Sequence, residues 1–168
     1  MKSGQQLPAI LHSLESRGLL AESMLVENCG LPGEANVLLD YYAVLPAMRC
    51  RGLGAELLAR LRGVCAGRWQ GIFIEAEDPA EAPDEGLAIR RLGFYTRAGA
   101  RMLKWESRVF GVRYRLFCLP CTQPDAPAAE DDDLVGSLAR LYHEMVPGPL
   151  YGPNVAFWRA DAQRPTFG

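Results

Sequence analysis

Long hydrophobic runs are missing from this sequence. No apolar run approaches the ~20 residues that a membrane-spanning helix needs, and Met1–Leu7 carries a single lysine with no long apolar stretch after it. No secretory signal is therefore visible, and we expect a cytoplasmic protein that does not bind membranes. A net charge of −2 also gives no general attraction to nucleic acid.

Cysteine and histidine are too scattered for a disulfide framework or a zinc site. The five cysteines, an odd number, are Cys29, Cys50, Cys65, Cys118 and Cys121. Their spacing indicates reduced thiols. The Cys118–Cys121 pair ends a predicted strand, whereas a thioredoxin-like pair opens a helix. His12 and His143 are isolated, so we expect no metal. Cys50, between two arginines, is the better candidate for a reactive thiol.

The composition is that of an ordinary globular protein. The chain has 168 residues, of which 49% are hydrophobic and 23% are charged, and this length suits one domain with a substantial core. We place that domain at residues 1–122. Residues 123–168 are predicted to hold an acidic, proline-rich linker, a helix and an irregular tail.

Hydrophobic periodicity predicts a series of strands and helices. The apolar spacing within 7–20 is roughly helical, and a short strand follows at 23–27. Later strands are expected at 37–45, 71–77, 102–105 and 109–119, and helices at 55–65, within 85–98 and after Asp131, Asp132 and Asp133, which we expect to cap the last helix. The helix at 55–65 should bury Leu53, Leu57, Leu58, Leu61 and Cys65. We expect residues 149–168 to be irregular.

The most informative segment is Arg49–Gly54, which follows the central strand and opens the next helix. Gly52 and Gly54 have no Cβ, so their backbone can adopt a positive φ and approach a ligand closely. The first N–H groups of a helix lack intrahelical partners and lie at its positive end. Arg49 and Arg51 add guanidiniums that suit phosphate oxygens. The segment indicates a pyrophosphate site, although Gly-x-Gly before a helix is also common as an ordinary tight turn.

Two common phosphate motifs fit this segment poorly. A P-loop needs a Lys-Ser/Thr pair where Ala55 and Glu56 stand, and the Rossmann fingerprint needs a third glycine where Leu57 stands. The pattern that fits is R-x-x-G-x-G after an apolar strand that ends in Val44-x-Pro46. It resembles the acetyl-CoA-binding signature of the GNAT superfamily of N-acetyltransferases.

A second segment strengthens the resemblance. Arg91–Ala100 is similar to the family's F-Y-x-x-x-G-F segment, with Ala100 in place of the usual aromatic residue. The two motifs occur in the family's order, and the resemblance covers about residues 21–119. It implies an α/β (α+β) fold, with a GNAT-like mixed, mostly antiparallel central sheet flanked by helices and here a C-terminal helical extension.

The chain departs from the family at its N-terminal end. Only about 36 residues precede the central strand, so the family's usual first strand and one of its two early helices are not visible. Three explanations stay open: the recorded start lies too far downstream, a partner subunit such as a second copy in a homodimer completes the sheet, or the C-terminal helix compensates.

The resemblance implies acetyl-CoA as the co-substrate. The backbone of Ala43, Val44 and Leu45 would pair with the pantetheine amides. The residues that would hold the pyrophosphate are Arg49, Cys50, Arg51, Gly52, Leu53, Gly54 and Ala55. In the family an amine attacks the acyl carbonyl directly in a ternary complex, so the lack of a Ser/His/Asp arrangement is not a difficulty.

Amine acetylation needs a group that accepts a proton. An alkylamine with a pKa near ~10.4 is almost wholly protonated at pH 7, and freeing its lone pair costs about 4.6 kcal/mol. A carboxylate, or a water molecule that it holds, should take this proton. The candidates are Asp40, Glu75 and Glu77, on the two strands that flank the gap expected in the family. Asp40 shares a face with apolar neighbours and is expected to be partly desolvated.

Tyr95 matches the family tyrosine that assists the departing thiolate. Proton transfer from a phenol near ~10 to a thiolate near ~8.5 is uphill by about 2 kcal/mol. A hydrogen bond to the developing charge is therefore expected, unless Arg90, Arg91 or Arg97 lowers the pKa of the phenol. The other interpretation of Tyr95 is an amphipathic core residue.

The acceptor is only coarsely specified. Aromatic residues that could line an amine pocket are Tyr41, Tyr42, Trp105, Phe110 and Tyr114. Acidic residues on the flanking strands favour a cationic amine, which is either a small molecule or a protein amine. We predict an N-acetyltransferase. The alternative is a non-catalytic or regulatory acyl-CoA-binding module, which the short N-terminal region and Ala100 favour.

Overall fold

The computed structural model describes the backbone of residues 9–16, 19–27, 36–44, 46, 49–121 and 128–162. Side chains are described for 36–40, 42–44, 46, 49–121 and 128–162. Cys29, Leu45 and residues 122–127, which include the first part of the linker expected at 123–133, lie outside these residues. The chain divides into two compact units: Met1–Ile74 with Leu119–Ala126, and Glu75–Cys118 with Pro127–Gly168.

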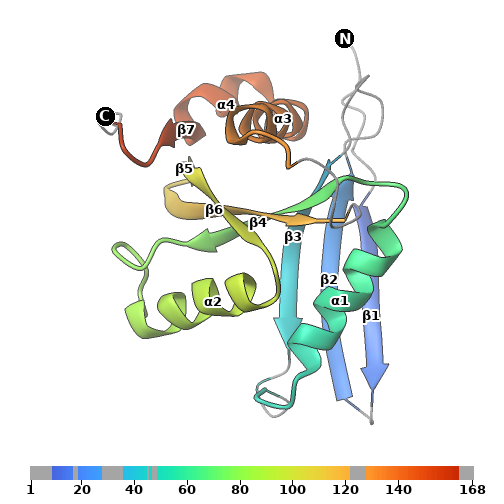
Figure 1. Cartoon of the computed structure of the whole chain (residues 1–168). Helices are drawn as coiled ribbons and strands as arrows, with labels where there is room; N and C mark the ends of the chain where they lie inside the picture. The colour runs from blue at the N-terminus through green and yellow to red at the C-terminus, as the bar shows by residue number, and fades with distance from the viewer. Residues whose placement is uncertain are drawn as a thin grey trace. The chain divides into compact units, whose positions relative to one another are not determined.

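The first unit consists of strands with one helix packed against them. Its elements are β1 (Ala9–Ser16), β2 (Leu19–Glu27), β3 (Asn36–Val44), α1 (Leu53–Cys65) and the first residues of β4 (Gly71–Glu77). The pairs β1–β2 and β2–β3 are antiparallel, whereas β3 and β4 are parallel. A parallel pair needs a crossover connection, and α1 supplies it while it lies along these strands (Figure 1).

The helix expected at 7–20 is wrong. This segment forms β1 and the start of β2, which pair continuously from Ala9↔Val26 to Ser16↔Leu19. The apolar residues that suggested a helix cover only a short segment. An isolated helix shorter than ~12–15 residues is only marginally stable, so this spacing was a weak indication. Pairing with β2 gives the backbone of β1 hydrogen-bond partners over its full length and therefore decides the structure. β2 accordingly begins at Leu19 instead of Ser23.

Strand β3 changes at Asp40. Its register with β2 passes from Leu25↔Leu39 to Met24↔Tyr41, so Asp40 is the extra residue of a β-bulge. The parallel pairing with β4 ends at the same point, with the Leu39↔Ile74 pair. Because a bulge interrupts the alternation of side chains, the faces before and after Asp40 cannot be related by counting residues.

The second unit joins strands to helices from later in the sequence. Its elements are the last residues of β4, α2 (Glu85–Arg97), β5 (Arg101–Val109), β6 (Val112–Pro120), α3 (Asp131–Met145), α4 (Gly148–Asn154) and β7 (Val155–Arg159). β6 lies between β4 and β5 in the strand order. β5 pairs antiparallel with β6 and with β7. The helices α2 and α3 lie on opposite sides of these strands (Figure 1).

Two expectations for this unit need correction. β5 runs to Val109 and does not end at Trp105, because the turn lies at Phe110 and Gly111. Their φ angles of 46° and 86° are the consecutive positive values of a tight hairpin turn. The segment expected to be irregular, 149–168, contains most of α4 and all of β7, because β5 offers β7 an open edge to pair with.

The helices bury the residues that their periodicity predicted. α1 buries Leu53, Leu57, Leu58, Leu61 and Cys65. The apolar stripe expected in α3 consists of Leu134, Leu138, Leu141 and Met145; the three leucines are buried, whereas Met145 is only half-buried. Asp131, Asp132 and Asp133 lie in the first turn of α3, and Glu130 is its N-cap residue. They are therefore first-turn acids that favour the helix through its dipole, and the expectation that they cap the helix is wrong.

These elements confirm the predicted fold class. The protein is α/β (α+β), with a mixed, mostly antiparallel arrangement of strands, flanking helices and additional helices at the C-terminal end. Within the described parts of the chain, no helix is long and apolar enough to cross a membrane.

Candidate functional site

The loop from β3 to α1 contains two residues with left-handed backbone conformations. The Arg49 N–H donates to the carbonyl of Pro46 at 3.3 Å. Cys50 has a φ of 61° and Gly52 a φ of 80°. Gly52 is the N-cap residue of α1, and its carbonyl accepts from the Glu56 N–H at 3.0 Å. A glycine suits this position because residues with a Cβ rarely adopt a positive φ.

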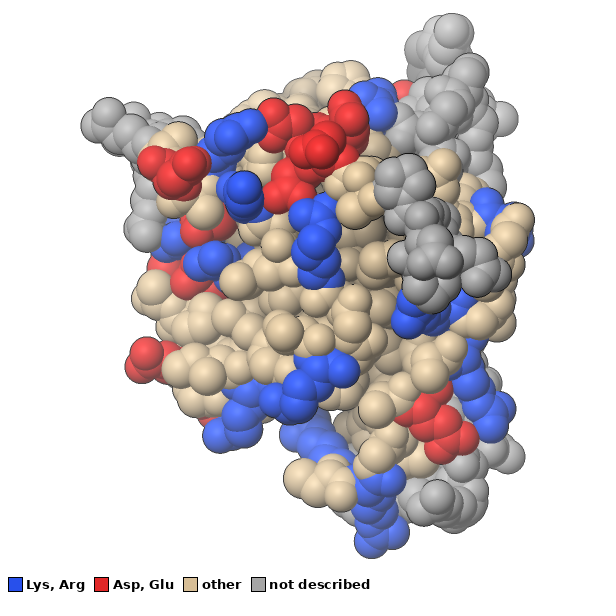
Figure 2. Space-filling view, in the orientation of Figure 1, with Lys and Arg blue, Asp and Glu red and all other residues tan. Residues whose placement is uncertain are grey.

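The N-terminus of α1 is open to a ligand. Among the described residues, no side chain caps the helix, and a Cβ added at Gly52 would meet none of their atoms within 4 Å. Arg49, Cys50, Arg51 and Ala55 are exposed, whereas Leu53 is buried and anchors the turn. Figure 2 shows basic side chains at this end of the unit. Exposed guanidiniums beside the positive end of a helix can hold an anion.

Gly54 serves a different purpose from Gly52. It lies in the first turn of α1 and is not among the residues with a positive φ. The expectation of a positive φ is therefore right for Gly52 and wrong for Gly54. The Gly54 carbonyl accepts a hydrogen bond from the hydroxyl of Tyr42. This contact ties the end of β3 to the start of α1, which is a role that the sequence did not suggest for Tyr42.

The end of β3 was predicted to pair with a cofactor. Ala43 and Val44 are half-buried, and on one edge they pair with Glu22 and Ala21 of β2. The Val44 carbonyl accepts from Arg49 Nε at 3.2 Å. A guanidinium from the loop therefore binds one of the backbone groups that the resemblance assigns to pantetheine.

Asp40 does not have the environment expected for it. The residue is exposed, whereas the sequence predicted partial desolvation. The prediction extended the side-chain alternation of β3 through Asp40, and the β-bulge at this residue breaks that alternation.

Tyr95 is a buried residue of the second unit. Its side chain is 6% exposed, and its ring lies 5.2 Å from Phe94 and 5.9 Å from Phe117 between centroids. Burial raises the pKa of Tyr95, and the positive charge of Arg91 offsets this only in part. The condition under which full proton transfer was expected, an arginine that lowers the pKa, is therefore not met.

Glu75 and Glu77 on β4 have different partners. Glu77 forms a salt bridge with Arg91 of α2 at 3.2 Å, and both side chains are more than one-third exposed. Glu75 accepts hydrogen bonds from two hydroxyls: Ser107 Oγ of β5, at 3.0 Å, and the phenol of Tyr142 on α3. Sequence reasoning missed both donors. The signal for Tyr142 was its position beside Leu138 and Leu141 on the apolar side of α3, where a residue with a polar tip needs a partner.

A buried ionic cluster supports the strands of the second unit. Glu106 Oε2 accepts from Arg113 Nη2 at 2.7 Å and from Trp158 Nε1 at 3.0 Å. Arg113 also pairs with Asp78 at 3.2 Å. Glu106, Arg113 and Asp78 are only 3%, 5% and 4% exposed. The cluster joins β5, β6, β7 and the residue after β4, and no pattern in the sequence indicated it.

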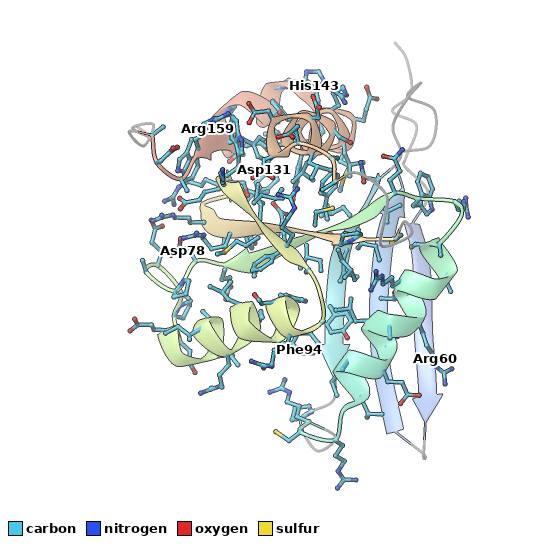
Figure 3. The ribbon with its side chains drawn as sticks, in the orientation of Figure 1. Arg60, Asp78, Phe94, Asp131, His143 and Arg159 are labelled. Carbon is cyan, nitrogen blue, oxygen red and sulfur yellow. The ribbon has the colours of Figure 1, made fainter. Side chains whose placement is uncertain are left out.

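An open hollow of about 560 Å³ lies at the start of α3. Its lining consists of Arg101, Lys104, Glu130, Asp131, Asp132, Asp133 and Arg159. Figure 3 labels Asp131 and Arg159 there, and Figure 2 shows the acidic and basic side chains gathered over this region. Arg101 pairs with Asp131, and Arg159 pairs with Asp132 at 2.6 Å. The hollow includes none of the predicted site residues, and its charges largely compensate one another.

The aromatic residues expected to line an amine pocket belong to both units, and those of the second unit have different surroundings. Trp105 donates from Nε1 to Asp132 at 2.9 Å and lies under Arg159, 5.8 Å from the ring centroid. Phe110 is 56% exposed at the tip of the β5–β6 hairpin. Tyr114 is half-buried, and the side chain of Tyr41 lies outside the described residues.

Comparison with known proteins identifies the fold. No protein-family model and no curated protein matches the sequence. Among solved structures, the chain is similar to the ribosomal-protein-S18-alanine N-acetyltransferase of Escherichia coli, with a TM-score of 0.52 and 16% identity over 75% of this chain and 77% of that one.

Two further structures agree. An IAA acetyltransferase from Bacillus cereus ATCC 14579 has a TM-score of 0.52 and 13% identity over 67% of this chain and 77% of that one. A GNAT-family protein from Bacteroides thetaiotaomicron has a TM-score of 0.52 and 20% identity over 76% and 67%. The chain therefore has the GNAT acetyltransferase fold.

Proposed function

We propose that this protein is an N-acetyltransferase that moves an acetyl group from acetyl-CoA to an amine in a ternary complex. The observation that carries the proposal is the loop before α1. It combines Gly52 at a φ of 80°, an uncapped helix start and the exposed Arg49 and Arg51. A diphosphate needs such an arrangement of backbone N–H groups and guanidiniums, and the loop occurs in a chain with an acetyltransferase fold.

Cofactor binding would use the end of β3 and the loop together. The Val44 carbonyl, which Arg49 now contacts at 3.2 Å, would accept a hydrogen bond from a pantetheine amide N–H. That exchange would free the Arg49 guanidinium for a phosphate oxygen, with which it forms a stronger, charge-assisted hydrogen bond. Ala43, Leu45 and the residues from Cys50 to Ala55 complete the proposed cofactor-binding set.

The proposed chemistry is direct attack of the amine on the acetyl carbonyl. Tyr95 would donate a hydrogen bond to the departing thiolate and keep its proton, because burial raises its pKa. A carboxylate among Asp40, Glu75 and Glu77 would accept the amine's proton, directly or through water. The acceptor would be a small-molecule or protein amine.

Calorimetric titration with acetyl-CoA tests the cofactor, with desulfo-CoA and NAD as controls. Micromolar binding of acetyl-CoA without binding of NAD is expected. A panel of small amines and peptide N-termini, with release of free thiol as the readout, then tests transfer. If acetyl-CoA does not bind to the chain, the pyrophosphate assignment is wrong.

The burial of Tyr95 favours one other function. A side chain that is 6% exposed and packed between Phe94 and Phe117 is also what a core tyrosine looks like. A non-catalytic acyl-CoA-binding module would keep such a residue. That module would bind acetyl-CoA but release no thiol in the presence of any amine, so the same two measurements separate the two functions.

A further inference from the structure

Glu75 is held from two directions within the second unit. Ser107 Oγ donates to its Oε1 at 3.0 Å, and the Tyr142 hydroxyl donates to its Oε2. Ser107 is fully buried and Tyr142 is 7% exposed, whereas Glu75 is half-buried and keeps some contact with solvent. One donor therefore comes from β5 and the other from α3, which follows the two motifs in the sequence by more than thirty residues.

Two hydroxyl donors change what the carboxylate can do. Each donates to a different oxygen, so together they fix the plane of the carboxylate. Hydrogen bonds to the charged form also stabilise it relative to the protonated form. The result is a carboxylate whose orientation is set by two neighbouring elements.

The other two candidate carboxylates, Glu77 and Asp40, are less suited to accept a proton from an amine. Glu77 is paired with the Arg91 guanidinium at 3.2 Å in a partly exposed salt bridge, and a cation at that distance competes with a substrate ammonium. Asp40 is exposed on a bulge, where solvent screens its charge. Only Glu75 among the three combines partial burial with two hydroxyl donors.

The hydroxyl of Tyr142 is not needed for the packing of its ring. The ring lies 6.0 Å from Phe157 between centroids, and the neighbouring Leu138 and Leu141 already bury this side of α3. A phenylalanine would fill the same space. The hydroxyl adds the contact with Glu75.

We infer that Tyr142 and Ser107 are positioning residues that orient Glu75 as the proton acceptor for the incoming amine. This inference rests on the proposed function and names the base for it. The substrate ammonium gives one proton to Glu75 or to a water molecule that it holds, and that proton passes to solvent. The freed lone pair then forms the C–N bond while the C–S bond breaks. The second N–H proton leaves with the thiolate as the free thiol.

The test removes the hydroxyl and keeps the ring. Tyr142→Phe is compared with Tyr151→Phe, a matched control on α4 whose hydroxyl donates to the Ala139 carbonyl at 3.4 Å. We expect Tyr142→Phe to lower kcat/KM for the amine about tenfold, with acetyl-CoA affinity unchanged by calorimetry. Glu75→Gln should lower it about 100-fold, within the usual range for loss of a general base. Tyr151→Phe should match the wild type.

A double variant separates positioning from a structural role. If Tyr142 acts through Glu75, then Tyr142→Phe should have almost no further effect in the Glu75→Gln background, since residues that act as a unit are not additive. Full additivity, or a Tyr142→Phe variant as active as Tyr151→Phe, would overturn the inference. If Tyr142→Phe fails to fold by its melting curve, the same cycle is run with Ser107→Ala, which removes the donor to the other oxygen.

The proposed function can fail separately. A wild-type chain that binds acetyl-CoA but releases no thiol with any amine overturns the enzyme proposal, and the role of Glu75 as base with it. An active wild type with an unaffected Tyr142→Phe variant overturns only the positioning role.

Discussion

Two sets of polar groups, one in each unit of this protein, are presented in opposite ways. In the first unit the candidate binding groups are backbone N–H groups at an uncapped helix start and the exposed Arg49 and Arg51. In the second unit one ionic cluster is enclosed: Glu106, Arg113 and Asp78 are at most 5% exposed. The groups before α1 are exposed to a ligand, whereas the charges of the buried cluster pair with one another.

This difference predicts that substitutions in the two places have different effects, on ligand affinity in one and on stability in the other. A side chain of the loop before α1 is in solvent, so its removal leaves no buried group without a partner, and its main effect should be on ligand affinity. A buried ion of the second unit compensates the charges of its neighbours, so its removal should mainly lower the free energy of unfolding. Variants of the two kinds can test this comparison.

Arg113→Met should have the largest effect. It removes the partner of Glu106 at 2.7 Å and of Asp78 at 3.2 Å, and leaves two buried carboxylates less compensated. Breaking a buried pair from one side costs about 3–5 kcal/mol, so we expect that loss in the free energy of unfolding measured with urea. The control is Arg60→Met, which breaks the Glu56 pair at 3.1 Å on the exposed side of α1 and should change stability by less than about 0.5 kcal/mol. Equal losses would remove the contrast between the units.

Arg49→Ala combined with Gly54→Val should abolish acetyl-CoA binding with little change in melting temperature. Arg49 is exposed, and valine at Gly54 places a branched side chain in the first turn of α1, beside the proposed phosphate position. A loss of more than about 100-fold in affinity, or ~2.7 kcal/mol, is expected by calorimetry. A matched control is Arg68→Ala, an exposed arginine after the other end of α1. Retained binding in the double variant would show that the loop does not hold the pyrophosphate.

Tyr95→Phe should lower turnover about tenfold and spare cofactor affinity. The change keeps the ring against Phe94 and Phe117 and removes the donor proposed for the thiolate, which is worth about 1.4 kcal/mol at this fold-change. Steady-state kinetics with acetyl-CoA and a reactive amine measure it, and a melting curve reports any loss of fold. An unchanged rate would remove Tyr95 from the mechanism and favour its interpretation as a core residue.

The smallest effect concerns Asp131 and depends on pH. Burial raises the pKa of this carboxyl, but the Lys104 N–H at 2.8 Å and the Arg101 guanidinium outweigh it, so the pKa is lowered. A group whose pKa is lower in the folded state stabilises the protein above its unfolded pKa, near ~3.9, and loses that contribution as the pH falls through the folded value.

Asp131→Asn should therefore lower stability by about 1 kcal/mol at pH 7, and the difference from the wild type should shrink at acid pH. Thermal melts between pH 7 and pH 2 measure it. Asp133→Asn is the control, since Asp133 lies exposed in the same helical turn and should show only the weaker dipole effect. A difference that stays constant across this range would contradict the assignment.

Local patterns predicted the central part of the fold. The apolar stripe of α1, the bounds of β4 at Gly71 and Glu77, and a helix within 85–98 were all predicted, because each element carries its own periodicity. Asp84 caps α2 by accepting from the Leu87 N–H at 2.8 Å, an arrangement that a short polar residue at a helix start favours.

The errors lie where pairing between strands decides. β1 and β7 are strands because they pair with β2 and β5, and neither segment has a spacing that reveals its partner. The bulge at Asp40 is a property of the β2–β3 register, so counting residues along β3 placed Asp40 wrongly. Pairing of this kind overrides weak local preference.

The sequence by itself determined the turn at Arg49–Gly54 and the helix that follows it, because glycines, guanidiniums and a helix start act on one another over a few residues. Only the tertiary structure decided the partners of each candidate carboxylate. Glu75 and Glu77 are two residues apart on one strand, but their partners differ. Glu75 accepts hydrogen bonds from Ser107 and Tyr142, which lie 32 and 67 residues away in the sequence. Glu77 pairs with Arg91, which lies 14 residues away. The sequence determines the chemical type of each side chain, whereas folding determines which groups it contacts.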